Sequence, residues 1–193
     1  MNKLLLTAPS VYPVSLAEAK EHLILETNDM DSLVDRFVKA ATAHVEYRTG
    51  RAIVRQKWRI YLDYFADEVS LEPNPVQEIH QVQYVDVDGA TQTVTSSIYT
   101  LDVAQQRLLK AYGQTWPTPR VQDNAVWIDV WAGYYDASTS PVNIRSLIPE
   151  DLKSAVLLMV GNLDQNRTMG IVGTSFAETP GFDLLIQPHR VFK

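Results

Sequence analysis

The chain lacks several residue types and motifs, and each absence excludes a class of protein. It has no cysteine among 193 residues, which excludes disulfide bonds, thiol nucleophiles and cysteine metal sites. It has no glycine-rich phosphate-binding loop of the GxxxxGKS/T or GxGxxG type. Its histidines, His22, His44, His80 and His189, share no metal-ligand spacing. We therefore expect neither a cofactor nor an enzymatic activity.

Long apolar runs and a surplus of positive charge are also missing. The N-terminus has only three consecutive leucines, and no apolar run approaches the length of a membrane span. Acidic residues outnumber Lys and Arg by 23 to 17, so the formal net charge is −6. Proteins that grip nucleic acid usually have a basic surplus, and this charge argues against that class. An acidic surface instead repels phosphate, so DNA could pass it without adhering.

Helical periodicity marks both ends of the sequence. Apolar side chains recur at three- and four-residue steps over residues 28–50, which predicts one long amphipathic helix. A capping-box pattern from Ser15 to Glu18 predicts a shorter helix before it, preceded by an extended arm over residues 1–12. Residues 149–166 predict a further helix, with a wide apolar face and two acids in the first turn.

Between these helices the pattern is typical of β structure. Residues 51–133 contain several runs in which apolar and polar side chains alternate, as in half-buried strands. The clearest is a hairpin over residues 78–94, with Asp88 and Gly89 as a turn pair that has the required backbone freedom. Strands and helices do not alternate, so a parallel α/β sheet is not expected.

These segments together predict an α+β fold in a single domain over residues 1–193. An N-terminal helical hairpin and a C-terminal helix pack together, with an antiparallel β-rich insertion between them and an extended C-terminal tail. The respective ranges are residues 1–50, 149–166, 51–133 and 167–193. In the tail, Pro188 argues against a regular helix.

Several segments, spread in order over nearly the whole chain, resemble one protein family. They are residues 13–23 (PVSLAEAKEHL), 40–63 (AATAHVEYRTGRAIVRQKWRIYLD), 73–89 (PNPVQEIHQVQYVDVDG), 130–134 (VWAGY), 148–152 (IPEDL) and 184–190 (LLIQPHR), with Tyr99, Leu101, Trp116, Pro117, Asn166 and Arg167 between them. The pattern resembles the head–tail connector, or adaptor, proteins of tailed bacteriophages and gene transfer agents.

The resemblance implies a non-enzymatic structural protein of the virion neck. Such connectors form a ring beneath the portal protein after DNA packaging, matched to the twelvefold portal. They carry the head–tail stopper or a tail-completion protein below. Packaged DNA then passes through the lumen without sequence-specific binding. The resemblance further implies assembly in the host cytoplasm and no membrane partner.

The apolar and basic C-terminal ending is the candidate portal-binding segment. The residues expected to dock on the portal, ordering on assembly, are Phe182, Leu184, Leu185, Pro188 and Arg190. The alternative is that Leu184, Leu185 and Ile186 pack back on the protein's own core.

The hairpin and two nearby cations are candidates for a contact with a neighbouring subunit or with the stopper. These residues are Asp86, Asp88, Gly89, Arg51 and Arg55. An ordinary solvent-exposed turn is the alternative for the hairpin.

A different class of function is suggested by five cations within twelve residues. They are Arg48, Arg51, Arg55, Lys57 and Arg59. Such a cluster would suit a small nucleic-acid-associated packaging or regulatory factor. A solvated sheet face or a subunit contact explains the same cluster within the acidic chain.

Overall fold

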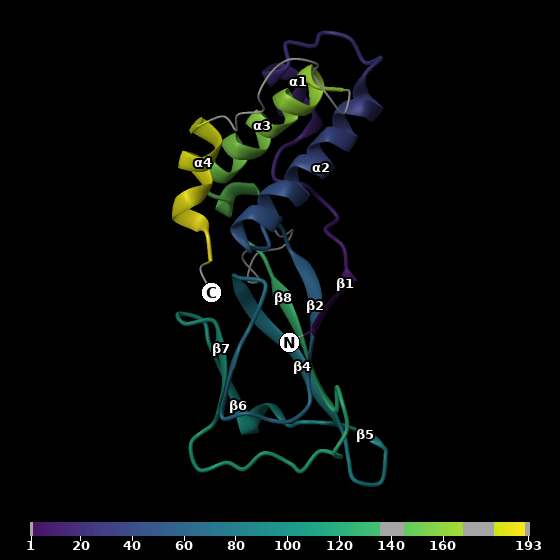
Figure 1. The fold of residues 1–193 in the computed structure, drawn as a ribbon, viewed down its shortest axis with the longest axis vertical. Coiled ribbons are helices and arrows are strands. Elements are labelled where there is room, and N and C mark those ends of the chain that lie inside the picture. Colours follow the sequence, from purple (N-terminus) through teal and green to yellow (C-terminus); the bar gives the residue numbers. More distant parts are fainter. Residues whose placement is uncertain (1, 136–144, 168–179, 192–193) are drawn as a thin grey trace, which may run out of the picture. The chain divides into compact units, whose positions relative to one another are not determined.

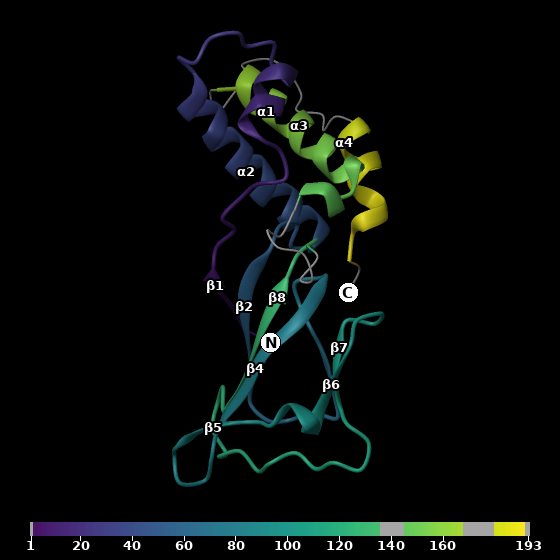
Figure 2. The ribbon, with the colours of Figure 1, turned by 180° about the vertical axis from the view of Figure 1, so that it is seen from behind.

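The chain has the predicted α+β fold, with helices and antiparallel sheets in separate parts of the molecule. The structure is a computed structural model that describes residues 2–135, 145–167 and 180–191. Figures 1 and 2 show it from opposite sides.

Two compact units divide the chain, and each is described by itself. The β unit comprises Met1–Pro9 and Arg55–Gly133. The helical unit comprises Ser10–Val54 and Tyr134–Lys193. The organisation of residues 1–193 as a single connector domain stays a prediction.

Helices of the described part of the chain build the helical unit. They are α1 (Leu16–His22), α2 (Asp31–Thr49), α3 (Glu150–Gln165) and α4 (Pro180–Ile186), with the 3-10 turns η2 (Arg145–Leu147) and η3 (Gln187–His189). Helix α2 packs on α3, and α1 and α4 pack against both (Figure 1). The centre of their core is formed by Val34, Val38, Ala41, Val45, Leu152, Ala155, Val156 and Val160. The predicted packing of the helical hairpin with the C-terminal helix is confirmed.

Local sequence signals set the ends of these helices. The side chain of Ser15 caps α1 and Glu18 binds the Ser15 backbone, which confirms the predicted capping box. Gly50 ends α2 in the left-handed conformation, with φ at 71°, and its N–H donates to the carbonyl oxygen of Glu46. Helix α2 begins at Asp31, later than the predicted Asn28, and the Asn28 side chain accepts a hydrogen bond from Lys20 instead of capping the helix.

The β unit is built on a five-stranded antiparallel sheet in the order β1-β2-β8-β4-β5. Its strands are β1 (Asn2–Thr7), β2 (Gln56–Leu62), β8 (Val126–Ala132), β4 (Val76–Val85) and β5 (Thr91–Thr93). Strands β4 and β5 form the predicted hairpin around Asp88 and Gly89. One face of the central strand β8 carries Val126, Ile128, Val130 and Ala132, all fully buried.

A smaller three-stranded sheet completes the β unit. It has the order β3-β7-β6, with β3 (Glu68–Ser70), β7 (Arg107–Lys110) and β6 (Tyr99–Asp102), and the 3-10 turn η1 (Ser96–Ile98) precedes β6. Val69, Leu71 and Leu108 of this part of the chain are buried. The β-rich insertion predicted between the helices is therefore confirmed.

Two parts of the sequence prediction need correction. The first is the N-terminal arm, which the sequence prediction groups with the helical hairpin over residues 1–50. Residues Asn2–Thr7 form β1 and pair with β2, so they belong to the β unit. The partner strand β2 lies about fifty residues later in the chain, so the short run of three leucines gives no local sign of this pairing.

The second correction concerns the ending predicted as an extended tail over residues 167–193. Pro180–Ile186 form helix α4, and Gln187–His189 continue as a 3-10 turn. Pro188 is accommodated because it lies in this final turn, after the α-helical hydrogen bonds have ended. Residues 168–179 lie outside the described residues.

Candidate interaction surfaces

The five predicted portal-binding residues of the C-terminal segment fall into a buried group and an exposed group. Phe182 is 8% exposed and belongs to the core of the helical unit, and Leu185 is partly buried against that core. Leu184, Pro188 and Arg190 are exposed. The alternative expectation, that the apolar residues pack on the protein's own core, therefore describes part of the segment, while Leu184, Pro188 and Arg190 stay exposed.

Polar contacts attach the same segment to α2 and α3. Arg48 Nη2 lies 2.8 Å from Asp183 Oδ1. Arg51 Nε donates to the carbonyl oxygen of His189 at 2.5 Å. His189 Nε2 lies 2.6 Å from Asp151 Oδ2 at the beginning of α3. Burial alone would raise the pKa of Asp151, but the hydrogen bond and charge of His189 outweigh it and lower the pKa.

The hairpin residues have two different roles. Asp86 Oδ1 accepts hydrogen bonds from the backbone N–H groups of Asp88 and Ala90, and Asp86 Oδ2 accepts one from Gln92 Nε2. The Gln92 hydrogen bond, followed by the backbone ones, lowers the pKa of Asp86. Gly89 has a φ of 87°, which glycine adopts without strain. Asp86 and Gly89 thus shape the turn, and Asp88 and Gly89 are both exposed at its tip.

The five clustered cations are divided between the two units. Arg48 and Arg51 belong to the helical unit, whereas Arg55, Lys57 and Arg59 belong to the β unit. Arg55 lies over the ring of Trp131, with its guanidinium carbon 3.7 Å from the ring centre. The predicted contact pair of Arg51 and Arg55 is therefore divided between the units, and each arginine makes contacts within its own unit.

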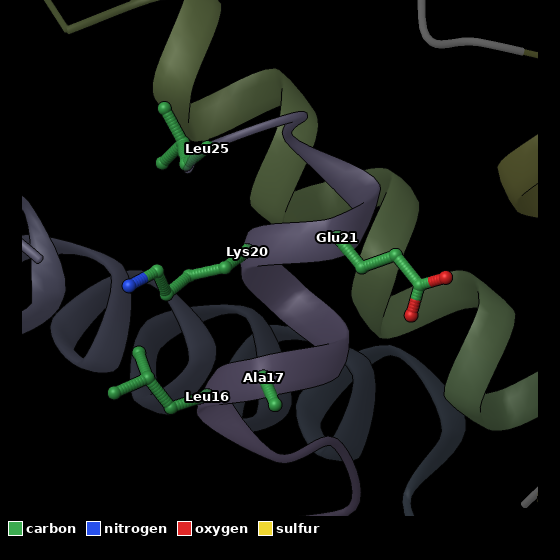
Figure 3. A pocket seen from close by; sticks show the side chains of 5 residues that line it. All are labelled: Leu16, Ala17, Lys20, Glu21 and Leu25. Atoms are coloured by element: carbon green, nitrogen blue, oxygen red, sulfur yellow. The ribbon is translucent and has the colours of Figure 1, made fainter. Parts of the chain in front are cut away.

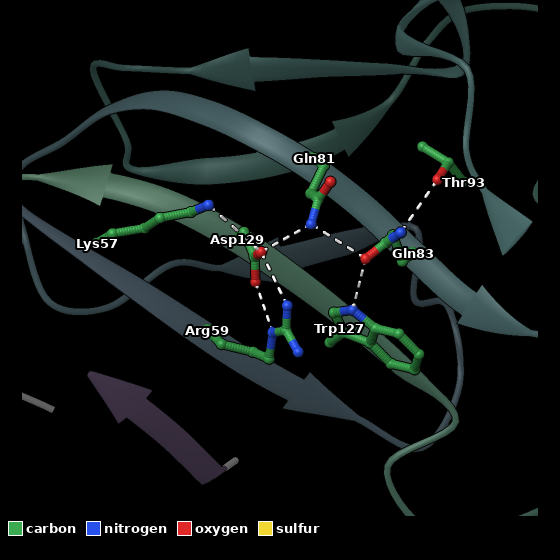
Figure 4. A network of polar contacts seen from close by, with 7 residues as sticks. All are labelled: Lys57, Arg59, Gln81, Gln83, Thr93, Trp127 and Asp129. Carbon is green, nitrogen blue, oxygen red and sulfur yellow. Dashed lines mark hydrogen bonds and ion pairs between the residues drawn. The ribbon is translucent and has the colours of Figure 1, made fainter. Parts of the chain in front are cut away.

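A network around Asp129 organises the polar face of the large sheet (Figure 4). Asp129 is 1% exposed on the central strand β8. It receives two hydrogen bonds from Arg59 on β2, at 2.7 and 3.0 Å, and one from Gln81 on β4 at 2.9 Å. Lys57 Nζ lies 3.8 Å from its carboxylate. Two strands thus supply the positive charge and the hydrogen bonds that a buried carboxylate requires.

The electrostatics of Asp129 follow from these contacts. Burial alone would raise the pKa of Asp129, but the hydrogen bonds from Arg59 and Gln81 and the charges of Arg59 and Lys57 outweigh burial and lower it. The hydrogen bond to Asp129 likewise raises the pKa of Arg59. Asp129 therefore stays ionised at neutral pH and holds β2, β8 and β4 together.

The network continues to the edge of the sheet. Gln83 accepts hydrogen bonds from Trp127 Nε1 and from Gln81 Nε2, each at 3.0 Å. Gln83 Nε2 then donates to Thr93 on β5 at 3.1 Å. Figure 4 shows these side chains along one face of the sheet. The alternating sequence VWIDVW places Asp129 on this face between two tryptophans, which is a signal that sequence reasoning overlooked.

A shallow hollow lies beside α1 in the helical unit (Figure 3). Its lining consists of Leu16, Ala17, Lys20, Glu21 and Leu25. Lys20 Nζ lies 2.7 Å from Asp31 Oδ1 and donates a hydrogen bond to Asn28 Oδ1 at 2.6 Å. The side chain of Glu21 points away from that of Lys20 (Figure 3).

Within residues 2–135, 145–167 and 180–191, no group of three or more His, Asp or Glu side chains could hold a metal ion. None of the described helices combines the length and the hydropathy of a membrane span.

Comparison with solved structures relates the fold to known particles. A chain in the neck of an empty gene transfer agent particle, computed with C6 symmetry, matches with a TM-score of 0.79 and 27% identity, covering 100% of this chain and 97% of that chain. The chain therefore shares its fold with a protein of the gene transfer agent neck. No family model and no curated protein matches the sequence.

Two other structures give the same result. The virion of a native gene transfer agent particle matches with a TM-score of 0.79 and 26% identity. The neck of a native particle, computed with C12 symmetry, matches with a TM-score of 0.77 and 26% identity. Both matches cover 100% of this chain and 97% of the other. The similarity over the full length supports a structural role in the neck of a phage-like virion.

Proposed function

We propose that this protein is a head-to-tail adaptor that forms a ring below the portal of a tailed phage or gene transfer agent. The observation that carries the proposal is the match of the whole chain to neck proteins at 26 to 27% identity. The ring attaches the stopper or a tail-completion protein and retains or conducts the packaged DNA. The protein acts in the virion neck and assembles in the host cytoplasm.

The proposed ring matches the twelvefold portal. Necks with C6 and C12 symmetry among the similar structures support a cyclic arrangement. Cyclic rings need two different surfaces on each copy, one for each neighbour. A net charge of −6 suits a lumen through which DNA moves, because acidic walls do not hold phosphate.

The exposed side of α4 and η3 is the proposed portal contact. Leu184 is 70% exposed although it lies between the core positions Phe182 and Ile186 on the same short helix. Pro188 and Arg190 extend this exposed group. Phe182 and Leu185 support it from the core. This refines the five-residue proposal: the buried pair positions the segment, and the exposed three meet the portal.

The β4–β5 hairpin is the proposed contact with a neighbouring subunit or with the stopper. Asp88 supplies an exposed negative charge at its tip, and Asp86 and Gly89 fix the turn behind it. Partners with a complementary basic patch would meet this charge.

A nucleic-acid-associated factor remains the alternative function, and the contacts of its cations weigh against it. Arg48 is paired with Asp183, and Lys57 and Arg59 with Asp129, so these charges are partly neutralised within the protein. A DNA titration at two salt concentrations tests this alternative, because phosphate binding weakens steeply with salt.

Co-sedimentation with the purified cognate portal tests the adaptor proposal. The wild-type chain should sediment with the portal, whereas Leu184→Asp should remain in the supernatant. Leu147→Asp is the matched control, since Leu147 is also exposed, at 47%, but lies in η2. Equal loss of binding in both variants, or none in either, would reject Leu184 as a specific portal contact. No sedimentation of the wild-type chain would reject the adaptor role.

A further inference from the structure

Strand β1 leaves one edge of the large sheet open and apolar. Among the described strands it pairs with β2 alone. Leu4, Leu5 and Leu6 are 51%, 39% and 38% exposed. The outer edge of a strand presents backbone N–H and C=O groups, and an apolar open edge is a template for pairing with another chain. The composition of this edge therefore fits a protein contact better than contact with water.

The opposite edge of the same sheet is open as well. Strand β5 pairs with β4 alone among the described strands, and all its residues, Thr91–Thr93, are exposed. Val87, in the adjoining turn, is 65% exposed. The sheet thus ends in two different open edges. A contact between two different surfaces is head-to-tail, and it closes into a ring when a rotation relates the copies.

The directions of the strands fit such a ring. All four pairings in the sheet are antiparallel. Because the number of strands is odd, the two edge strands β1 and β5 run in the same direction. The rotation between neighbours in a ring of many copies is small and nearly preserves this direction. Strand β1 of one copy can therefore meet β5 of the next as a parallel pair, with corresponding faces of the two sheets aligned.

We infer that β1 of one copy adds to β5 of the next, so that the sheets of neighbouring copies join around the ring. The inference rests on the ring of the proposed function and names the surface that forms it. The regular part of β1 ends at Leu5, where the register shifts, so Asn2–Leu5 is long enough to pair with all of Thr91–Thr93. This contact satisfies the backbone N–H and C=O groups of the two open edges, and it covers the exposed leucines of β1.

Because the chain has no cysteine, introduced pairs can test this contact directly. The strand register places Leu5 on the face of Val130. Gln92 lies on that same face, whereas Leu4 lies on the opposite face, with Asp129. The test variant is therefore Leu5→Cys with Gln92→Cys. Its matched control is Leu4→Cys with Gln92→Cys, in which the two thiols face opposite sides of the joined sheet.

A disulfide within one copy cannot form in either variant. Four strand spacings separate the sheet edges, which is roughly 19 Å, far beyond the reach of a disulfide. The full-length variants are mixed with the purified portal, inspected by electron microscopy for rings, oxidised, and separated on a non-reducing gel. The single variants Leu5→Cys and Gln92→Cys are treated in parallel.

The Leu5/Gln92 variant should give a ladder of covalent oligomers, and the Leu4/Gln92 control should give at least tenfold less. Rings that form without a ladder would overturn the strand pairing and leave the adaptor role intact. Dimers from Leu5→Cys alone would also overturn it, because they indicate β1 paired with β1 in a twofold dimer. Absence of any ring on the portal would overturn the adaptor role, and the inference with it.

Discussion

Arg59 donates two hydrogen bonds to Asp129, from Nε at 2.7 Å and from Nη2 at 3.0 Å, across neighbouring strands of the large sheet. Asp129 is almost fully buried, while Arg59 keeps a quarter of its side chain exposed. A two-pronged arginine–carboxylate pair has fixed geometry and is stronger than hydrogen bonds between neutral groups. The pair therefore sets the alignment of β2 and β8 at the centre of the sheet whose edges we propose to join.

Replacement of Asp129 should destabilise the protein in a pH-dependent manner. Asp129→Asn removes the negative charge that Arg59 and Lys57 face, and we expect a loss of about 2 kcal/mol at pH 7. The folded-state pKa of Asp129 is lowered, so its contribution is complete above about pH 4 and is lost as the pH falls through the folded-state pKa. Urea unfolding from pH 7 down to pH 2 measures the difference.

The matched control for this variant is Glu78→Gln. Glu78 lies on the neighbouring strand β4 and is exposed, so the substitution should change stability by less than about 0.5 kcal/mol at pH 7. A constant difference between Asp129→Asn and wild type at every pH would contradict the assigned ion pair.

Substitutions at buried and at exposed positions of the C-terminal segment should have different effects on stability. Ile186 is fully buried in the helical core, so Ile186→Ala should cost about 3 kcal/mol of stability. Leu184→Ala should change stability by less than about 0.5 kcal/mol, since Leu184 is mostly exposed. Thermal and urea unfolding of both variants check this. Equal losses would show that α4 does not pack as described.

Because α4 packs on the core, a truncation of the C-terminal segment should affect stability as well as portal binding. An extended tail could be removed without harm, but deletion of residues 181–193 removes Phe182 and Ile186 from the core. We therefore expect the truncated chain to be destabilised, and point substitutions to be the cleaner test of portal binding.

Two glycines of the helical unit should respond to alanine with opposite signs. Gly50 ends α2 with φ at 71°, so Gly50→Ala should cost about 1 kcal/mol from backbone strain. Gly161 lies inside α3, and a Cβ there would meet His22 Nε2 at 3.4 Å. Gly161→Ala should therefore add about 0.5 kcal/mol, from the higher helix propensity of alanine. Urea unfolding compares the two, and the same sign for both would contradict the helix bounds.

Substitution of the two hairpin aspartates, Asp86 and Asp88, should have different effects on the turn. Asp86→Ala removes the acceptor for the Asp88, Ala90 and Gln92 donors, so amide hydrogen exchange in the turn should accelerate. Asp88→Ala should leave the exchange pattern of the turn unchanged, because its side chain lies at the exposed tip. Accelerated exchange in both variants would indicate that the turn depends on its total negative charge.

Elements with strong local signals could be predicted from the sequence. The long helix before Gly50, the capping box at Ser15, the hairpin at Asp88 and the β-rich insertion are all present. Each depends on periodicity or on residues close together in the chain. Strand β1 was missed as part of the sheet because its partner is chosen by long-range pairing. Helix α4 is not predicted because a proline so close to it indicates a break, although Pro188 falls after the helix.

The Asp129 network could not be assembled from the sequence for a similar reason. Arg59 lies 70 residues before Asp129, and Gln81 lies 48 residues before it. Alternation shows that Asp129 and Trp127 share a face, but it does not show which strands flank them. The portal and stopper contacts stay predictions, since they depend on surfaces of other proteins.

The most direct test of the adaptor role is electron microscopy of the full-length protein mixed with its purified cognate portal. We expect an added ring of this protein on one end of the portal, with copies related by the symmetry of the portal. Portal particles without added density, at protein concentrations well above that of the portal, would contradict the adaptor role.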